Sequence, residues 1–229
     1  MSLSLSPSPV LVRCQGILFD MDGILISSIG SVERSWTKWA QWRGVDPAHA
    51  LSIAHGRRSI ETVARLRPDL DPVAENEVIE NLEIEDTDGV TVLPGVLELL
   101  ALLPTNRWTV VTSATEPLAR VRLAAGRIPV PERIITSENV PEGKPHPAPF
   151  LAGAALLGFA PEDCVVLEDA PPGVKSGRTA GCTVIATTFS HPAGALNEAQ
   201  YLIRDVTGVG AETTPNDTGI ALRFVPLER

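Results

Sequence analysis

The most informative part of the sequence is Gly16-Ile17-Leu18-Phe19-Asp20-Met21-Asp22-Gly23. It starts as a short apolar run typical of a buried strand, and two carboxylates follow where the run ends and Gly23 permits a turn. In an open parallel sheet, side chains at the carboxyl ends of the strands face the crevice where ligands bind. Asp20 and Asp22 are therefore candidate functional residues, although Asp and Gly are also common in plain surface turns.

From residue 93 onward, strand-like apolar runs alternate with helical patterns. Strands are expected at 108–111, 133–135, 164–167 and 183–186, and helices at 96–103, 116–123, 148–157 and after Pro172-Gly173. Residues 201–203 and 220–225 are expected to add edge strands, the second antiparallel after a turn at 216–219. The alternation predicts an α/β fold with a Rossmann-like parallel sheet covered by helices.

The segment between residues 27 and 92 has a different pattern, with four helical stretches and no convincing strand. Asp46-Pro47 and Asp71-Pro72 each combine an N-cap residue with proline at the first helical position, and Ser59 can cap a third helix. Trp36 and Trp39 fit a packing stripe better than a substrate platform. We expect a core of residues 10–26 and 93–229, with an all-helical cap, residues 27–92, inserted as a lid over the carboxyl edge of the sheet.

Charge and hydropathy limit the partners of this chain. Its 229 residues are 44% hydrophobic and carry a formal net charge of −9, which disfavours binding to nucleic acid or to an anionic membrane surface. No apolar run approaches the ~20 residues that span a bilayer. An anionic substrate must therefore be captured by a local positive site. No pattern in the sequence indicates an oligomeric state.

Two features bear on localisation. Residues 1–9 are rich in Ser and Pro and lack the basic and apolar regions of a signal peptide, so they are expected to be a disordered leader. Cys14, Cys164 and Cys182 lie in or beside apolar runs without metal-ligand spacing. Reduced, buried thiols in a cytoplasmic protein are the expected interpretation.

Polar residues follow three further strands or loops of the expected core: Thr112, Ser113, Lys144, Glu168 and Asp169. Each has a simpler explanation, as a helix cap, a solvated loop lysine or turn acids. Together with the first motif they form a set suited to phosphoryl transfer. Several carboxylates suit Mg²⁺, which keeps some waters and bridges to phosphate. A hydroxyl, backbone amides and the Lys144 ammonium suit phosphate oxygens, and this ammonium favours ionised carboxylates nearby.

These motifs resemble the haloacid dehalogenase-like superfamily over almost the whole chain, from Cys14 to about Thr207. The helical insert is similar to that of the alpha-helical cap subclass. Four segments resemble a branch of sugar- and polyol-phosphate phosphatases that includes glycerol-phosphate and 2-deoxyglucose-6-phosphate phosphatases. They are His55-Gly56-Arg57, Thr112-Ser113-Ala114-Thr115, Gly143-Lys144-Pro145-His146-Pro147 and Leu167-Glu168-Asp169-Ala170-Pro171.

The resemblance implies a role for each matched residue. Asp20 would be the nucleophile that forms a phosphoaspartate, and Asp22 the general acid and then the general base. Mg²⁺ would be held by Asp20, the backbone carbonyl of Asp22 and Asp169, with Glu168 adjacent. The phosphoryl group would be held by Thr112, Ser113 and Lys144. The expected activity is hydrolysis of a small phosphorylated metabolite.

Other activities compatible with the same core are a phosphohexomutase, a dehalogenase and a non-catalytic binding module. Mutases of the beta-phosphoglucomutase type carry a cap histidine ten residues after the second aspartate, where this chain has Val32. Dehalogenases lack the second aspartate, and a binding module has no need of a complete catalytic set. Hydrolysis is therefore favoured.

The expected cap loop carries three basic residues that offer candidate substrate contacts. His55, Arg57 and Arg58 are expected between two cap helices and could reach over the phosphate, with Arg57 the better match to the family. A solvated basic turn is the alternative. Ser27 and Ser28 lie where the chain leaves the core and are candidate hinge residues.

Overall fold

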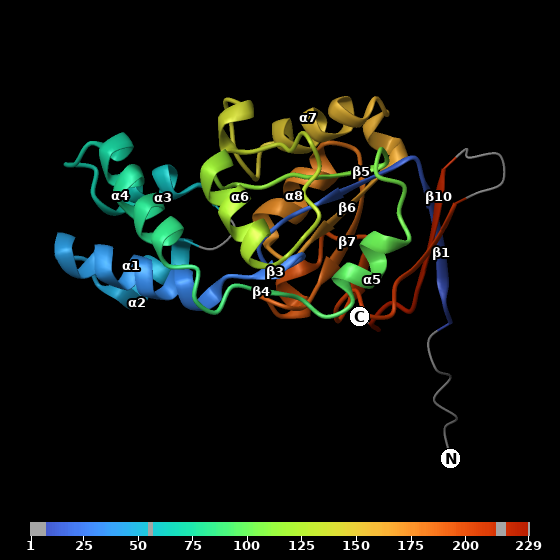
Figure 1. The fold of residues 1–229 in the computed structure, drawn as a ribbon, viewed down its shortest axis with the longest axis horizontal. Coiled ribbons are helices and arrows are strands. Elements are labelled where there is room, and N and C mark those ends of the chain that lie inside the picture. The colour runs from blue at the N-terminus through green and yellow to red at the C-terminus, as the bar shows by residue number, and fades with distance from the viewer. Residues whose placement is uncertain (1–7, 55–56, 214–218, 229) are drawn as a thin grey trace, which may run out of the picture.

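The computed structural model describes residues 8–54, 57–213 and 219–228. Its centre is a five-stranded parallel sheet of order β5-β2-β6-β7-β8 (Figure 1). The strands are β2 (Gly16–Phe19), β5 (Trp108–Val110), β6 (Cys164–Glu168), β7 (Thr183–Thr187) and β8 (Tyr201–Ile203). The predicted parallel sheet is therefore confirmed. Residues 1–7, His55 and most of the expected turn at 216–219 lie outside the described residues, and residues 8–9 have no regular structure.

Helices cover both faces of this sheet, as the alternating pattern predicted. On one face lie α5 (Val96–Ala101) and α6 (Glu116–Ala125), and on the other α7 (Ala148–Leu157) and α8 (Pro171–Thr179). β2 is buried on both sides, because Ile17 and Phe19 belong to the first core and Leu18 to the second. A central strand with two buried faces needs an unbroken apolar run, and this is what the opening stretch supplies.

A second sheet packs against the α5 and α6 side of the core. It is antiparallel, of order β1-β10-β9, from Val10–Cys14, Ile220–Phe224 and Gly210–Thr213. The expected antiparallel strand near residue 220 is confirmed, whereas β1 and β9 were not predicted. The strand expected at 133–135 is wrong, because Ile135 forms only an isolated bridge to Val111.

The inserted segment contains the four expected helices, α1 (Ile29–Arg43), α2 (Pro47–Ala54), α3 (Ser59–Leu66) and α4 (Pro72–Glu85). They pack around a separate apolar cluster that includes Trp36 and Trp39, so these tryptophans form the predicted packing stripe. Asp71 caps α4 through a bond from the Val73 amide, whereas Ser59 is the first residue of α3 and makes no capping bond. Figure 1 shows the four helices grouped beside the sheet.

Strand structure occurs at both ends of the expected all-helical range 27–92. β3 (Ile26–Ser27) pairs antiparallel with β4 (Thr91–Val92), and the Leu93 amide donates to the Leu25 carbonyl at 3.0 Å. The expectation of no strand in this range is therefore wrong at its ends, because the two connecting segments lie side by side and satisfy each other's backbone groups. The division into core and cap otherwise stays a prediction.

The three cysteines are buried free thiols. Burial is the main cause that raises the pKa of Cys14, Cys164 and Cys182 to about 12. Such thiols are chemically inert packing groups. Within the part of the chain that the structure describes, no helix has the length and apolar character required to cross a bilayer.

Candidate active site

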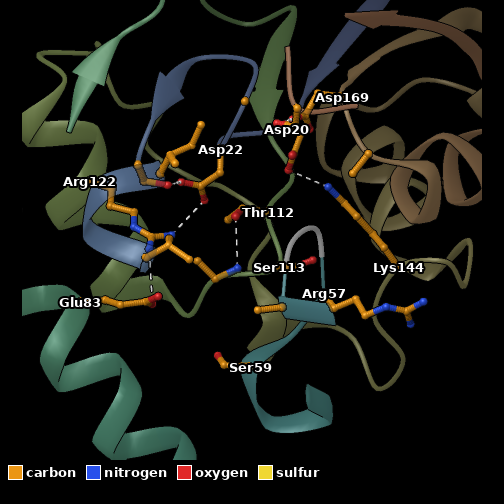
Figure 2. Close-up of a pocket in the computed structure, with 18 of the residues that line it drawn as sticks. Asp20, Asp22, Arg57, Ser59, Glu83, Thr112, Ser113, Arg122, Lys144 and Asp169 are labelled. Carbon is orange, nitrogen blue, oxygen red and sulfur yellow. Dashed lines mark hydrogen bonds and ion pairs between the residues drawn. The ribbon is translucent and has the colours of Figure 1, made fainter. Parts of the chain in front are cut away.

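The pairing of the strands brings Asp20, the first carboxylate of the opening motif, beside Glu168 at the end of β6. Phe19 lies opposite Leu167 of β6 on one side and Val110 of β5 on the other. Asp20 after β2, Glu168 at the end of β6 and Thr112 two residues after β5 are thus collected at one edge. Figure 2 shows Asp20, Thr112, Lys144 and Asp169 around one cavity, which encloses about 100 Å³.

Lys144 is the cation at the centre of this edge. Its Nζ donates to Asp20 Oδ1 at 2.6 Å, to Glu168 Oε1 at 2.8 Å and to the Val111 carbonyl at 3.2 Å. All three donors of the ammonium are therefore used, and the residue is only 2% exposed. Burial lowers its pKa, but Asp20 and Glu168 outweigh that effect and raise the pKa above its usual value. Lys144 is held as a buried cation.

The acids form a cluster whose charge exceeds that of the lysine. Carboxylate oxygens of Asp20, Glu168 and Asp169 lie within 4.8 Å of one another and all three residues are buried. One ammonium against three carboxylates leaves two negative charges uncompensated. Burial is the main cause that raises the pKa of Asp20 and of Asp169, so Lys144 alone does not keep them ionised. A hard divalent cation with oxygen ligands fits this donor set.

Within the cluster the acids differ in how many bonds they already make. Glu168 Oε2 accepts from the backbone amides of Asp169 and Ala170 at 2.8 and 2.9 Å, while its Oε1 accepts from Lys144. Both oxygens of Glu168 therefore have protein partners. Asp169 Oδ2 accepts from the Ser190 hydroxyl, and the ring of His191 lies 3.1 Å from the Asp169 carbonyl. Sequence reasoning missed Ser190 and His191, which lie in a loop after β7 without a recognisable motif.

Gly23 is required where the first motif turns. Its φ is +85°, and a Cβ at this position would lie 1.9 Å from Asp169 Oδ2. A side chain there would displace the acid across the cavity. The glycine of the opening stretch thus serves both the turn and the close approach of Asp169.

Asp22 faces a different side of the cavity from Asp20. Its Oδ1 accepts from the Ser28 hydroxyl, and its Oδ2 lies 3.0 Å from Arg122 Nη1 of α6. Arg122 Nη2 in turn lies 3.3 Å from Glu83 Oε2 of α4. Figure 2 shows this row of Asp22, Arg122 and Glu83. The two carboxylates of the motif therefore have separate environments, which suits separate tasks.

Arg122 and Glu83 were missed by sequence reasoning, although each leaves a signal. Arg122 follows Leu118 by four residues and Glu83 follows Ile79 by four, so both lie on the buried face of their helix. A charged residue on an apolar helix face needs a buried partner. These two residues supply it for each other across the boundary between the helical insert and the sheet.

Thr112 and Ser113 line the same cavity. Thr112 Oγ1 accepts from the Ala114 amide at 3.1 Å, and the Thr112 amide donates to the Ile135 carbonyl at 2.9 Å. The capping alternative is wrong, because α6 begins at Glu116 and its N-cap residue is Thr115. The Thr112 hydroxyl accepts a local turn bond and keeps its own hydrogen to donate.

The basic residues of the insert occupy different places. Arg57 is exposed and lines the cavity. Arg58 instead donates to the carbonyls of Pro141 and Val140 at 3.0 and 2.8 Å, so it ties the insert to the loop before Lys144. These bonds contradict the solvated-turn alternative for Arg58, while a contact of Arg58 with phosphate stays a prediction. His55 lies outside the described residues, and no contact of it is described.

Comparison with known proteins agrees with this geometry. A family model described as haloacid dehalogenase-like hydrolase matches residues 14–181. The chain belongs to the haloacid dehalogenase-like hydrolase family. Hexitol phosphatase A of Escherichia coli (strain K12) is 40% identical to this hydrolase over 212 residues, covering 90% of this chain and 97% of the relative. Glycerol-1-phosphate phosphohydrolase 1 of Saccharomyces cerevisiae is 34% identical over 204 residues, covering 82% and 80%.

A solved structure shows the same fold. The crystal structure of a hydrolase from Pseudomonas syringae aligns with a TM-score of 0.76 at 22% identity, covering 84% of this haloacid dehalogenase-like hydrolase and 94% of that chain. The resemblance expected from the motifs, including the branch with glycerol-phosphate phosphatases, is confirmed.

Proposed function

We propose that this chain is an Mg²⁺-dependent phosphatase that hydrolyses a small sugar- or polyol-phosphate monoester through a phosphoaspartate on Asp20. One observation carries the proposal. A buried aspartate with a lysine at 2.6 Å and two further acids within 4.8 Å lies in a cavity that also contains a second aspartate and a threonine hydroxyl. The names of the relatives, which act on hexitol and glycerol phosphates, support the substrate class.

In the first step an Asp20 oxygen forms a bond to phosphorus and the bond from phosphorus to the alcohol oxygen breaks. The departing alkoxide takes its proton from Asp22. In the second step water attacks the phosphoaspartate, gives a proton back to Asp22 and releases inorganic phosphate from Asp20. Because Asp22 lies two residues after Asp20 on the same turn, one carboxyl group serves as the acid of one step and the base of the next.

Charge on the phosphoryl oxygens must be stabilised in both steps. Lys144, the Thr112 hydroxyl and the Ser113 amide are the proposed protein donors. Asp20, Asp169 and the backbone carbonyl of Asp22 would hold Mg²⁺, which supplies further charge stabilisation when bound. Glu168 would act beside the metal, and its bonds to Lys144 and to two amides suit it to hold the lysine in place.

The phosphohexomutase alternative finds no support in the site. At the position of the mutase histidine stands Val32, which is one of the apolar residues lining the cavity. A non-catalytic module would not need the buried lysine and acids. We further expect the enzyme to act in the cytoplasm on a small phosphorylated metabolite, with the insert, residues 27–92, as its cap.

The test is a screen of the purified protein against sugar, polyol and hydroxy-acid phosphates, with phosphate release as the readout, in Mg²⁺ and in EDTA. We expect release from polyol or sugar phosphates that EDTA abolishes and added Mg²⁺ restores. Interconversion of hexose phosphates without net release would favour the mutase. Absence of turnover for all substrates and for p-nitrophenyl phosphate would favour a binding module.

A further inference from the structure

Arg122 is a buried cation that the catalytic steps above do not use. It is 4% exposed, and its Nη1 donates to Asp22. Its Nε and Nη2 are also buried, yet neither makes a hydrogen bond to the described residues. The Nη2 approach to Glu83, at 3.3 Å, is an ion pair without hydrogen-bond geometry. Buried donors of a guanidinium are normally satisfied, so two free ones call for an acceptor.

The location of these free donors restricts what the acceptor can be. Arg122 and Glu83 both line the cavity that contains Asp20, on its Asp22 side (Figure 2). Asp22 is the proposed proton donor to the departing alcohol, so this side of the cavity is where the alcohol would lie. The acceptor is then part of the alcohol and not the phosphoryl group, which belongs beside Lys144.

Apolar side chains also line this cavity. They include Val32 and Trp36 of α1 and Leu118 of α6. A polyol chain matches such a surface, because its carbons present C–H groups to apolar side chains while its hydroxyls both donate and accept hydrogen bonds. Glu83 is an acceptor and Arg122 a donor, so the pair can satisfy both functions of a diol.

We infer that Glu83 and Arg122 form a hydroxyl-binding subsite that selects phosphate esters of uncharged polyols by their leaving group. The inference rests on the proposed function. Glu83 accepts a hydrogen bond from one substrate hydroxyl, and Arg122 donates to the oxygen of another. Charge adds a second selection when Glu83 is ionised, because a leaving group with its own carboxylate or second phosphate then lies beside the Glu83 carboxylate and is disfavoured.

Three phosphate esters test this subsite: glycerol 1-phosphate, n-propyl phosphate, which lacks the hydroxyls, and 3-phosphoglycerate, which carries a carboxylate. The wild-type enzyme is expected to favour glycerol 1-phosphate over each of the others by about tenfold or more in kcat/KM. In Glu83→Ala the preference for glycerol 1-phosphate over n-propyl phosphate should shrink by about 10- to 100-fold. Glu83→Gln, which keeps the shape of the side chain, should raise the rate on 3-phosphoglycerate relative to glycerol 1-phosphate.

Glu85→Gln is the matched control, because Glu85 ends the same helix and is exposed. It should leave the three rates and their ratios as in the wild type. Equal losses on all esters in the Glu83 variants, or ratios unchanged within twofold, would overturn the subsite while the phosphatase activity stands. A purely structural role of Glu83 predicts such equal losses. If the wild type released phosphate from none of the esters, nor from p-nitrophenyl phosphate, both the function and the subsite would be rejected.

Discussion

Lys144 Nζ lies 2.6 Å from Asp20 Oδ1, although 124 residues separate them in the chain. The same ammonium lies 2.8 Å from Glu168 Oε1. Two strand ends and the loop before α7 are thus joined by one charge in the buried edge of the sheet. Because the three groups are at most 7% exposed, water does little to replace any of them.

Removing this cation should therefore lower the stability of the fold as well as the activity. Lys144→Met leaves Asp20 and Glu168 without a counter-ion, and breaking a buried ion pair by removing one partner costs about 3–5 kcal/mol. We expect a loss of that size in the free energy of urea unfolding, measured in EDTA. Lys175→Met, on the exposed side of α8, should change it by less than about 0.5 kcal/mol. A loss below about 1 kcal/mol for Lys144→Met would contradict the buried pair.

Substitutions of the two aspartates of the opening motif should impair catalysis in different ways. Asp20→Asn should abolish turnover and phosphoenzyme formation, because an amide is a poor nucleophile. Asp22→Asn should slow both steps by about 10²-fold or more, since acid and base assistance are lost while the nucleophile remains. Rapid-quench detection of protein phosphate that is stable in acid and labile in alkali distinguishes the two variants. Substantial activity in Asp20→Asn would remove the aspartyl-phosphate mechanism.

Neighbouring arginines of the insert provide a matched pair. Arg57 lines the cavity, so Arg57→Ala should lower kcat/KM for a polyol phosphate by about 10- to 150-fold, the scale of a charged hydrogen bond, and p-nitrophenyl phosphate should lose less. Arg58 instead binds the carbonyls of Val140 and Pro141. Arg58→Ala should therefore weaken the contact between the insert and the core, and kcat/KM for both substrates should fall by a similar factor. Steady-state kinetics on both substrates is the measurement, and unchanged rates in Arg57→Ala would leave it a solvated residue.

Glu83 should give the stability of the protein a specific dependence on pH. Burial is the main cause that raises its pKa from 4.5 to about 7, and Arg122 opposes this only in part. Between these values the folded chain binds a proton that the unfolded chain has lost, so the Glu83 contribution to stability falls as pH rises from about 4.5 to 7. Glu83→Gln has no such titration.

The free energy of unfolding of Glu83→Gln, relative to the wild type, should therefore increase by about 1–3 kcal/mol between pH 4.5 and 7. Urea unfolding in EDTA at several pH values measures it. Glu85→Gln, which alters an exposed carboxylate, should show a flat difference. A flat difference for Glu83→Gln as well would mean that Glu83 titrates as in the unfolded chain.

The sequence was sufficient to predict the parallel sheet and the acids at its edge. Parallel strands meet at a common end, so residues that directly follow apolar runs, such as Asp20 and Asp169, must come together. The helical insert was equally readable, because Asp71-Pro72 and the Trp36 and Trp39 stripe are local signals. These inferences need only short-range patterns and one general rule of topology.

The parts of the fold and of the site that the sequence did not predict depend on contacts that local patterns do not specify. β1 pairs with β10 through Val10 opposite Phe224, so its existence depends on a partner at the far end of the chain. Arg122 and Glu83 meet only because the insert is seated on α6 in one orientation. The failed strand at 133–135 has the apolar residues of a strand but forms only one bridge, between Ile135 and Val111, and Val111 lies beyond the last residue of β5.

The β3–β4 ribbon has a consequence for how this protein family can vary. Ile26 is paired with Val92 and Ser27 with Thr91, so the chain enters and leaves the insert at adjacent backbone positions. An insert whose two ends are neighbours imposes no separation on the strands that flank it. Its length and sequence can therefore change without altering the positions of Asp20, Lys144 and Asp169 relative to one another.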